Sequence, residues 1–506
     1  MIDRERLTSL LTASLSAAQP IHGDSLSPIQ AFACTANDLF SFGGAYSLKI
    51  PDYQRPYVWN TGHIAVFLRD LDTYLKQIAE EDEAPRNRFY FGTILLHRTP
   101  GNVYSIIDGQ QRLTTLLILD YVLNRSSSLL ETKSDHLKLC FGSRISKENI
   151  RYNRIFMENN PLSVPSAAVL ARLLEYIAFT VIVTSFEDDA FIFFDTQNSR
   201  GVTLGATDLL KAYHLRGLRG KEDQQAYFAR QWDHDNRGQF LQGLFKQGLW
   251  RGRRWRGKRV EYEDRDQLLD EFQRQTKRAA GEDKISIFPG RANSFASSSF
   301  TTDGTVRIEG EVPAEIRDAR NYPFSLRQPI EKGAAFFLFS SKYAALYRYL
   351  FEQENELEPA VRDLREFYVH VYEPISQFLR QLFELCILLY FDRFGPNKLL
   401  AFSLWLDYLL GAYRVGQKSI VEQTPVKILR DEEQNLLDII ANAYLPEEVF
   451  EFILAISDEA AYREEEIGEG RRVREQYKRN ILTYYGRERG THLGKKKTWI
   501  DEKLNH

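Results

Sequence analysis

The pattern of apolar and polar residues predicts a mixed N-terminal part. Four short apolar or β-branched runs have the length and composition of strands: Ala45–Ile50, Tyr90–Leu96, Val103–Ile107 and Thr180–Thr184. Apolar side chains at every third or fourth position predict a helix over about residues 61–80, and Leu113–Leu123 is typical of a buried helix. Two short helices are expected at about 188–197 and 207–216, the second with Thr207 as its N-cap.

Helical spacing dominates from about residue 325 to 465, with the longest stretches at Phe367–Phe394 and Lys398–Arg414. Phe288–Gly304 is rich in Ser, Gly and Thr and is expected to be a loop or linker. The expected fold class is therefore an α+β N-terminal domain followed by a mostly α-helical C-terminal domain. The expected parts are a helical lead (1–27), the α+β domain (28–220), a basic insert and linker (221–315) and a helical domain with a basic tail (316–506).

Net charge does not decide the function class, because 66 basic and 69 acidic residues give a net charge of −3. The hydrophobic fraction of 43% and the charged fraction of 27% exclude a disordered or fibrous protein. Cationic residues are nevertheless concentrated locally, with six of them in 250–259 and 11 Lys or Arg against 4 Asp or Glu in 470–506. Any contact with nucleic acid is therefore expected to be local.

Cysteine usage and apolar run length bear on the compartment. The three cysteines, Cys34, Cys140 and Cys386, are far apart and form no CxxC pair, which favours a reducing cytoplasm. The most apolar stretches, such as Leu399–Tyr413, are interrupted by charge and are shorter than the ~20 residues of a membrane helix. A cytoplasmic protein without membrane contact is expected.

The first motif is IPDYQRPYVW, in which polar residues are held between aromatic residues and two prolines. Tyr53, Gln54 and Arg55 form its centre. A rigidly presented guanidinium can bind phosphate through two N–H groups, so Arg55 is a candidate anion ligand. A surface turn with aromatic packing and an incidental arginine would explain the same residues.

The second motif is IIDGQQRLTTLL, a strand followed by a glycine turn and an apolar helix. This arrangement directs free backbone N–H groups and the helix dipole toward a bound phosphate. Arg112 would add positive charge, Gln110 and Gln111 could hold water or a sugar, and Asp108 could bind a divalent ion. The simpler alternative is a strand-to-helix turn with Asp108 as an N-cap.

The third motif is FFDTQNSRGVTLGATDLLKAY, with a polar turn at Asn198, Arg200 and Gly201 between apolar segments. Asp208 and Lys211 follow at a spacing of three residues. They could contribute to a site or form a simple salt bridge on one helix.

These motifs, occurring together and in this order, resemble those of the N-terminal domain of the GmrSD-type restriction proteins. That family is large and has a ParB-like fold. The matching stretches lie within about residues 28–220: IPDYQRPYVW, YFGTILL, IIDGQQRLTTLL and FDTQNSRGVTLGATDLLKAY. The resemblance implies a ParB-like domain that binds and hydrolyses a nucleoside triphosphate with Mg²⁺ or a similar divalent ion, without a P-loop. It also implies defence against phage DNA, often DNA with modified bases or backbones.

The resemblance also implies roles for residues. The family signature falls on Asp108, Gly109, Gln110, Gln111 and Arg112, with Asp108, Gln110, Gln111 and Arg112 as catalytic residues and Asp108 as the metal ligand. The expected nucleotide-binding residues are Gln54, Arg55, Gly109, Thr114, Asn198, Arg200 and Lys211. Tyr53 is expected to contact DNA at the sensing side of the pocket.

The chain departs from the family pattern in its C-terminal half. Many members carry an HNH-type nuclease there, but beyond residue 315 the only histidines are His370, His492 and His506, and none lies in an HNH pattern. The resemblance then implies a sensor subunit whose partners are modified phage DNA and a separately encoded HNH-type nuclease. The sequence leaves open whether the chain forms a homo-oligomer.

The segment WRGRRWRGKR at 250–259 is a second candidate DNA contact. It formally fits GxxxxGK, but Arg259 stands where a P-loop needs Ser or Thr, so a P-loop is rejected. As a basic patch it would contact phosphates and stack a tryptophan on exposed bases. The residues concerned are Arg251, Arg253, Arg254, Trp255, Arg256 and Lys258. A solvated loop with aromatic anchors is the alternative.

The leading hypothesis is a nucleotide-binding and nucleotide-hydrolysing sensor subunit of a modification-dependent anti-phage restriction system. Its nucleotide would lie between the first two motifs and would gate DNA recognition and the partner nuclease. One alternative is a self-contained modification-dependent endonuclease with an unrecognised active site in 220–506. The other is a non-catalytic DNA-binding or interaction protein that keeps the ParB-like pocket as a ligand sensor.

Overall fold

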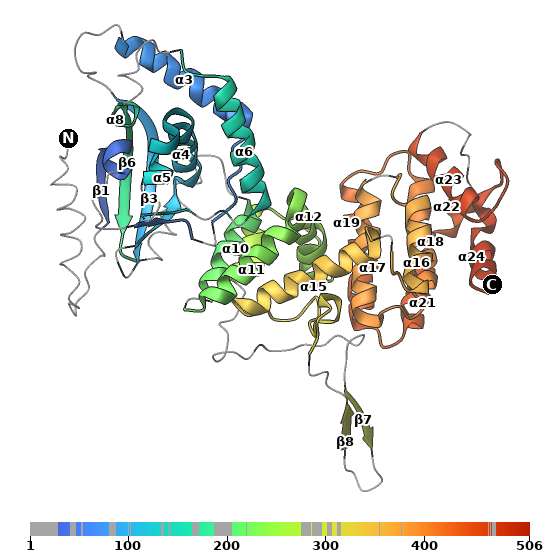
Figure 1. Ribbon diagram of the computed structural model, residues 1–506. Helices are drawn as coiled ribbons and strands as arrows, with labels where there is room; N and C mark the ends of the chain where they lie inside the picture. The colour runs from blue at the N-terminus through green and yellow to red at the C-terminus, as the bar shows by residue number, and fades with distance from the viewer. Residues whose placement is uncertain are drawn as a thin grey trace. The chain divides into compact units, whose positions relative to one another are not determined.

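A computed structural model of the chain describes most of residues 29–505 (Figure 1). The description leaves out 1–28, 41–46, 52–53, 80–87, 100, 102, 133–135, 140, 142, 164–171, 187–204, 219, 275–284, 286–295, 301–305, 311–314, 354, 376, 464, 466, 468–471 and 506. The predicted N-terminal lead and the helix expected at about 188–197 lie outside the described residues.

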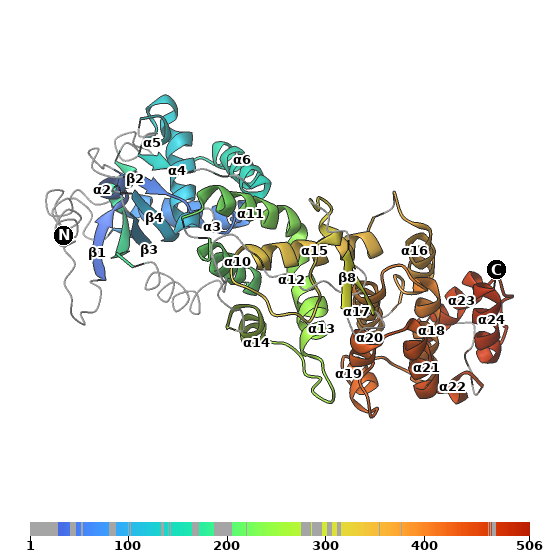
Figure 2. The ribbon, with the colours of Figure 1, turned by 90° about the horizontal axis from the view of Figure 1, so that it is seen from below.

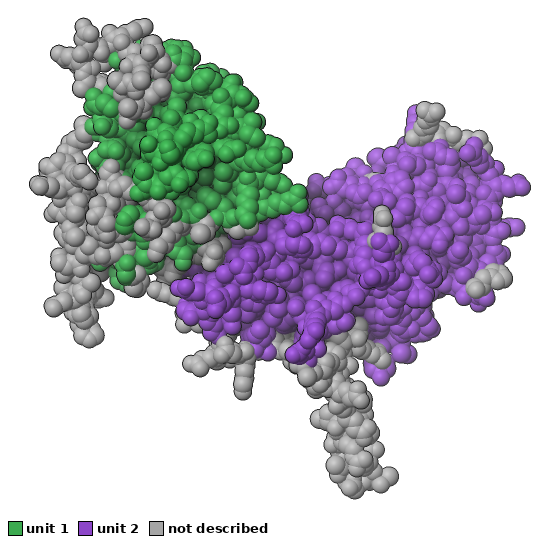
Figure 3. Space-filling model, viewed as in Figure 1, with its two compact units in different colours: residues 1–204 green, residues 205–506 purple. Residues whose placement is uncertain are grey.

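The chain forms two compact units, residues 1–204 and 205–506, which are coloured separately in Figure 3. Unit 1 contains a six-stranded mixed sheet, and unit 2 is mostly helical. The expected fold class, an α/β region followed by a mostly helical region, is confirmed.

The sheet of unit 1 has the strand order β1-β6-β3-β4-β2-β5. The strands are β1 (Gln30–Thr35), β2 (Ser47–Lys49), β3 (Phe89–Thr99), β4 (Val103–Asp108), β5 (Leu137–Lys138) and β6 (Ile177–Thr184). β1 pairs with β6, and β3 with β4, in antiparallel fashion, whereas β3–β6, β4–β2 and β2–β5 are parallel. The four strands predicted from the sequence are therefore present, and β1 and β5 are additional.

Helices pack on the sheet in two groups. The short helices α2 (Ala36–Phe40) and α8 (Leu173–Tyr176) pack against each other and against β1 and β6. The second group is α3 (Thr61–Ala79), α4 (Gln110–Asn124) and α6 (Arg144–Asn159), in which α6 packs against both α3 and α4 (Figure 1). Two short helical segments, η1 (Arg125–Ser127) and α5 (Leu129–Thr132), follow α4.

The core of unit 1 explains why these elements form. The apolar face of α3, including Leu71 and Leu75, is fully buried, as its helical spacing predicts. The strand residues Ile94 and Phe179 are fully buried as well. Since β3 and β6 are interior strands of the sheet, their near-continuous apolar runs are those of strands covered on both faces.

Unit 2 begins with α10 (Ala206–Arg216), whose N-cap is Gly205 rather than the predicted Thr207. The next helices are α11 (Glu222–Asp235), α12 (Phe240–Gly243), the π-helical η3 (Leu244–Trp250), α13 (Arg251–Arg254) and α14 (Arg265–Leu269). Within the stretch expected to be a loop or linker, β7 (Ala296–Phe300) instead pairs with β8 (Val306–Gly310) in an antiparallel hairpin.

The remainder of unit 2 is helical, as Figure 2 shows. Its helices are α15 (Ala334–Phe351), α16 (Pro359–Val371), α17 (Gln377–Phe394), α18 (Leu399–Gly416), α19 (Gln423–Arg430), α20 (Leu436–Asn442), α21 (Pro446–Ile456), α22 (Glu459–Arg463), α23 (Val473–Tyr484) and α24 (Lys496–Leu504). α18 packs against α16, α17, α21, α22 and α24. A helix that is apolar nearly all round needs such covering on every side.

The basic C-terminal tail is folded onto α18 rather than extended. Lys496 is fully buried, and its Nζ lies 2.6 Å from Asp407 Oδ2. Tyr372 and Tyr477 donate hydrogen bonds of 3.0 and 2.9 Å to Asp407 Oδ1. Gly411 permits this approach, since a Cβ there would lie 2.0 Å from the Tyr477 hydroxyl. The tail is thus part of the core of unit 2.

Among the described residues, no helix combines the length and the apolar character that crossing a membrane requires.

Candidate functional site

The DGQQR motif forms the turn between β4 and α4. Asp108 is the last residue of β4, Gly109 is the N-cap, and Gln110 begins the helix. Gly109 has φ +97°, a left-handed conformation that glycine adopts without strain. A Cβ on Gly109 would also lie 3.0 Å from Ile94 Cγ1 of the neighbouring strand. Glycine is therefore required here both by backbone conformation and by the close approach of β3.

Hydrogen bonds from two glutamines connect the first motif to the second. Gln54 Nε2 donates to the carbonyl oxygens of Ile106 and Ile107, at 3.0 and 2.6 Å. In return, Gln111 Oε1 accepts from the backbone N–H groups of Val58 and Trp59, at 2.9 and 3.2 Å. Gln111 Nε2 also donates to the Pro56 carbonyl at 3.1 Å. The amide of Gln111 is thus largely used in positioning the 56–59 segment.

Helix α6 supports the first motif from the other side. Ser146 Oγ accepts from the Tyr57 backbone N–H at 2.8 Å, and Asn149 donates to the Tyr57 carbonyl at 2.9 Å. Asn153 Nδ2 donates to the Trp59 carbonyl at 2.7 Å and to the Tyr57 hydroxyl at 3.0 Å. Burial raises the pKa of Tyr57, so this phenol stays protonated and neutral in the interior.

Arg112 and Asp108 lie together at the end of β4. Arg112 Nη1 donates to the Thr93 carbonyl oxygen, and its Nη2 is 3.6 Å from Asp108 Oδ2. Both side chains remain 28% exposed. A guanidinium has five N–H groups, so these two interactions leave N–H groups of Arg112 free to meet an anion. Asp108 supplies the carboxylate oxygens that a hard cation prefers.

Arg112 also lines a cleft of about 780 Å³ that brings both motifs to one cavity. Trp59 and Asn60 at the end of the first motif line it, together with His63 and Tyr90. The Trp59 and His63 rings are nearly parallel, with 6.0 Å between their centroids. The cleft therefore offers aromatic surface beside a cation, which suits a ligand with a planar ring and a negative charge.

Two other positions predicted for the site carry polar atoms that lack partners among the described residues. Gln110 and Thr114 are buried one helical turn apart on α4, and Gln110 Oε1 and Thr114 Oγ1 make no hydrogen bond with a described residue. Such atoms are rare in folded proteins, because leaving them unpaired costs about 1–3 kcal/mol each. Of the two signature glutamines, Gln110 has the free acceptor and Gln111 does not.

The other residues predicted for the nucleotide site are placed as follows. Arg55 is partly buried, and its guanidinium makes no hydrogen bond or ion pair with the described residues. Tyr53, Asn198 and Arg200 lie outside the described part of the chain. Lys211 belongs to unit 2, where its buried Nζ pairs with Asp233 Oδ1 of α11 at 2.8 Å. Its ammonium is thus engaged by Asp233 within unit 2.

The basic segment at 250–259 needs a correction, because half of its predicted DNA contacts are buried. Arg251 makes a bidentate pair with Glu263, at 3.0 Å for each bond. Arg253 Nε donates to Glu271 Oε1 at 2.6 Å, and burial lowers the pKa of Arg253. Trp255 is 1% exposed and donates its indole N–H to the Glu261 carbonyl, so its ring has no face free for a base.

The remaining members of that segment are exposed. Arg254 pairs with Asp270 and Glu271, whereas Arg256 and Lys258 are exposed beside the turn at Gly257. A surface for DNA in this segment is thus reduced to Arg254, Arg256 and Lys258. The alternative of a loop with aromatic anchors describes Trp250 and Trp255 better, since both are buried.

Within the described part of the chain, no group of three or more His, Cys, Asp or Glu side chains is suited to holding a metal ion.

Several residues that build this region were not predicted from the sequence. Ser146, Asn149 and Asn153 hold the first motif, yet they lie in a helix that the sequence analysis did not identify. Their spacing of three and four residues places them on one helical face, and a polar stripe of this kind could have indicated a buried hydrogen-bonding surface. Trp59, His63 and Tyr90 line the cleft, but only the fold brings them together.

Comparison with known families gives two matches along the chain. Residues 36–215 match the model of the GmrSD restriction endonuclease, N-terminal domain, and residues 224–469 match a family of unknown function (DUF7834). No curated protein matches the chain. The first match spans the DGQQR turn and the cleft beside it. Residues 36–215 are thus similar to the N-terminal domain of the GmrSD restriction endonuclease, which supports a role in a GmrSD-type restriction system.

Proposed function

We propose that this protein is the nucleotide-binding and nucleotide-hydrolysing sensor subunit of a restriction system that acts on modified phage DNA. Nucleotide binding in unit 1 would gate DNA recognition and the activity of a separately encoded HNH-type nuclease. The observation that carries the proposal is the cleft of about 780 Å³ in which Trp59 of the first motif and Arg112 of the second line one cavity.

The base and the phosphates would be recognised by different walls of this cleft. Trp59, His63 and Tyr90 provide aromatic faces for a purine or pyrimidine ring. Arg112 provides the positive charge for the phosphates, and its fixed contact with the Thr93 carbonyl orients the guanidinium. Arg55, which forms no ion pair with a described residue, is a second cation in the adjoining segment and would add to this charge.

A divalent ion fits the residues at the end of β4. Asp108 has an exposed carboxylate whose described ion pair is the 3.6 Å contact with Arg112. Mg²⁺ in nucleotide sites commonly uses one or two carboxylates together with phosphate oxygens, so Asp108 would hold the ion. The bound ion would neutralise phosphate charge, and Gln110, whose Oε1 makes no hydrogen bond with a described residue, would orient water.

A hydrolysis assay on the full-length protein tests the proposal. Each of the four radiolabelled nucleoside triphosphates is incubated with Mg²⁺ and either wild type or Arg112→Ala. We expect Arg112→Ala to lower the hydrolysis rate at least about tenfold, because a phosphate-stabilising cation is lost. Arg125→Ala is the control, since Arg125 lies just beyond the other end of α4 and pairs with Glu158.

The outcomes separate the alternatives. Equal hydrolysis by wild type and Arg112→Ala would overturn the catalytic assignment. Nucleotide binding without turnover would favour a ligand sensor over an NTPase. Cleavage of modified phage DNA by the purified protein alone would favour a self-contained nuclease over a subunit with a nuclease partner.

A further inference from the structure

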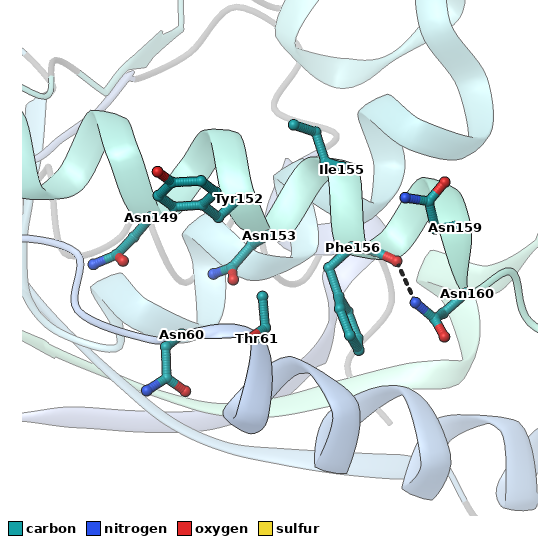
Figure 4. Close-up of a pocket in the computed structure, with 9 residues that line it drawn as sticks. All are labelled: Asn60, Thr61, Asn149, Tyr152, Asn153, Ile155, Phe156, Asn159 and Asn160. Carbon is teal, nitrogen blue, oxygen red and sulfur yellow. Dashed lines mark hydrogen bonds between the residues drawn. The ribbon is translucent and has the colours of Figure 1, made fainter.

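A second pocket lies between α6 and the start of α3, beside the first motif (Figure 4). Its volume is about 410 Å³, and five of its nine lining residues are asparagines. In Figure 4, Asn149, Asn153 and Phe156 point from α6 toward Asn60 and Thr61. The pocket combines amide groups with an apolar wall.

No charged side chain lines this pocket among the residues that the structure describes, so its ligand should be neutral at the part that enters. Carboxamides offer a donor and an acceptor together, which matches the edges of nucleobases. Asn153 is fully buried, and its Oδ1 has no hydrogen-bond partner among the described residues, although its Nδ2 has two. A buried acceptor in the wall of a pocket indicates a ligand that brings a donor.

Tyr152 supplies an aromatic face at the same pocket. Its side chain is 60% exposed, which is unusual for a large ring in a helix that packs against two others. Bases stack on such exposed rings without needing a particular sequence. Ring and amides together therefore fit a flat heterocycle with polar edges.

The outer surface of α6 carries cations that have no acidic partner. Lys147 and Arg151 are exposed, lie four residues apart, and form no ion pair with a described residue. Like charges at this spacing destabilise a helix slightly. Arg144, by contrast, is paired with Glu148 on the same helix. Cations on the helix that lines the pocket suit the phosphates of a strand whose base enters that pocket.

We propose that this pocket binds one unpaired base of a DNA strand, with the flanking phosphates on Lys147 and Arg151. The inference rests on the proposed function only in taking DNA as the nucleic acid. The pocket is distinct from the cleft that holds Arg112, although Asn60 lines both. It gives unit 1 a site for reading DNA at an exposed base, which the basic segment at 250–259 does not provide.

Oligonucleotide binding tests this site without nucleotide or partner. Fluorescence anisotropy compares a labelled 12-mer of thymidylate with an abasic 12-mer of equal length on the full-length protein. Wild type should prefer the intact strand by at least about fivefold, the effect of stacking one base. Tyr152→Ala should lose this preference, and Tyr152→Phe should keep it because the ring remains.

Two charge variants complete the test. Lys147→Ala and Arg151→Ala should each reduce the slope of log affinity against log salt by about 0.7, whereas Arg144→Ala should not. A Tyr152→Ala protein that still prefers the intact strand overturns the proposal, as does a wild type that binds both strands equally. A wild-type protein that hydrolyses no nucleotide but still prefers the intact strand over the abasic strand would refute the proposed function. The proposal for this pocket would remain valid in that case.

Discussion

Gln54 and Gln111 each hydrogen-bond to the backbone of the segment that carries the other. Gln54 donates to Ile106 and Ile107 at the end of β4, and Gln111 accepts from Val58 and Trp59 at the end of the first motif. The two motifs are thereby held as one unit before any ligand binds. Such preorganisation lowers the cost of fixing a site when the ligand arrives.

Replacing Gln111 by leucine should loosen the first motif. The variant leaves the backbone N–H groups of Val58 and Trp59 without an acceptor, at a cost of about 1–3 kcal/mol. Hydrogen exchange measured by mass spectrometry should show faster exchange at these two amides. Gln111→Glu keeps the acceptor oxygen and is the matched variant, so it should exchange nearly as slowly as wild type. Protection unchanged in Gln111→Leu would contradict the positioning role.

Gly109→Ala should destabilise unit 1 more than Gly101→Ala does. Both glycines have positive φ, +97° and +82°, so each alanine costs about 1–2 kcal/mol in backbone strain. Only Gly109 has a close neighbour, Ile94 Cγ1 at 3.0 Å from the added Cβ. Thermal unfolding of the two variants measures the difference in their stability losses, which is the steric cost of the contact between the new Cβ and Ile94. Equal losses of stability would show that β3 yields to the extra methyl group.

His214 should make unit 2 less stable as the pH falls. Burial lowers its pKa from 6.5 to about 3, and its ring lies between the Phe272 carbonyl and the Gly333 N–H. Between these pH values the unfolded chain binds a proton that the folded chain excludes, so stability falls by about 1.4 kcal/mol per pH unit on acidification.

Urea unfolding at pH 5.5 and 4.5 measures this contribution. Between pH 5.5 and pH 4.5, the free energy of unfolding of His214→Gln should fall by about 1.4 kcal/mol less than that of wild type. The variant has no imidazole to protonate in the unfolded state. The exposed His370 gives a matched control, and His370→Gln should follow wild type. The same pH dependence in all three proteins would contradict the assignment.

Lys496→Met should strongly destabilise unit 2. It leaves the fully buried Asp407 carboxylate without its 2.6 Å partner, and breaking a buried pair typically costs about 3–5 kcal/mol. Lys497→Met is the control, because Lys497 is half exposed and its pair with Glu459 should contribute under ~1 kcal/mol. Comparable unfolding midpoints for the two variants would count against a structural role for the buried pair.

Local patterns in the sequence predicted much of the fold but less of the site. The apolar runs of β3 and β6 and the spacing in α3 and α18 are signals within single elements, so they could be recognised without the tertiary structure. β5 is only two residues long and exists because β2 lies beside it. The DGQQR turn was predicted from its residue order, and the cleft beside it required the fold.

The roles of individual polar residues were harder to predict, because a side chain's partner is a tertiary property. Arg251 and Arg253 resemble a DNA-binding patch in a linear count of charges, yet their carboxylate partners are Glu263 and Glu271. Gln110 and Gln111 are adjacent and chemically identical, but one has a free acceptor and the other holds the first motif. The two glutamines differ in role because their side chains lie on different faces of α4.

The buried pair of Asp407 and Lys496 also determines the order of folding steps during translation. The carboxylate emerges from the ribosome about ninety positions before the lysine that neutralises it, and domains generally fold from the N-terminus as the chain grows. α18 therefore cannot reach its final packing until α24 has been translated. Unit 2 should complete its folding only after α24 has left the ribosome, which makes shorter nascent chains substrates for chaperones and proteases.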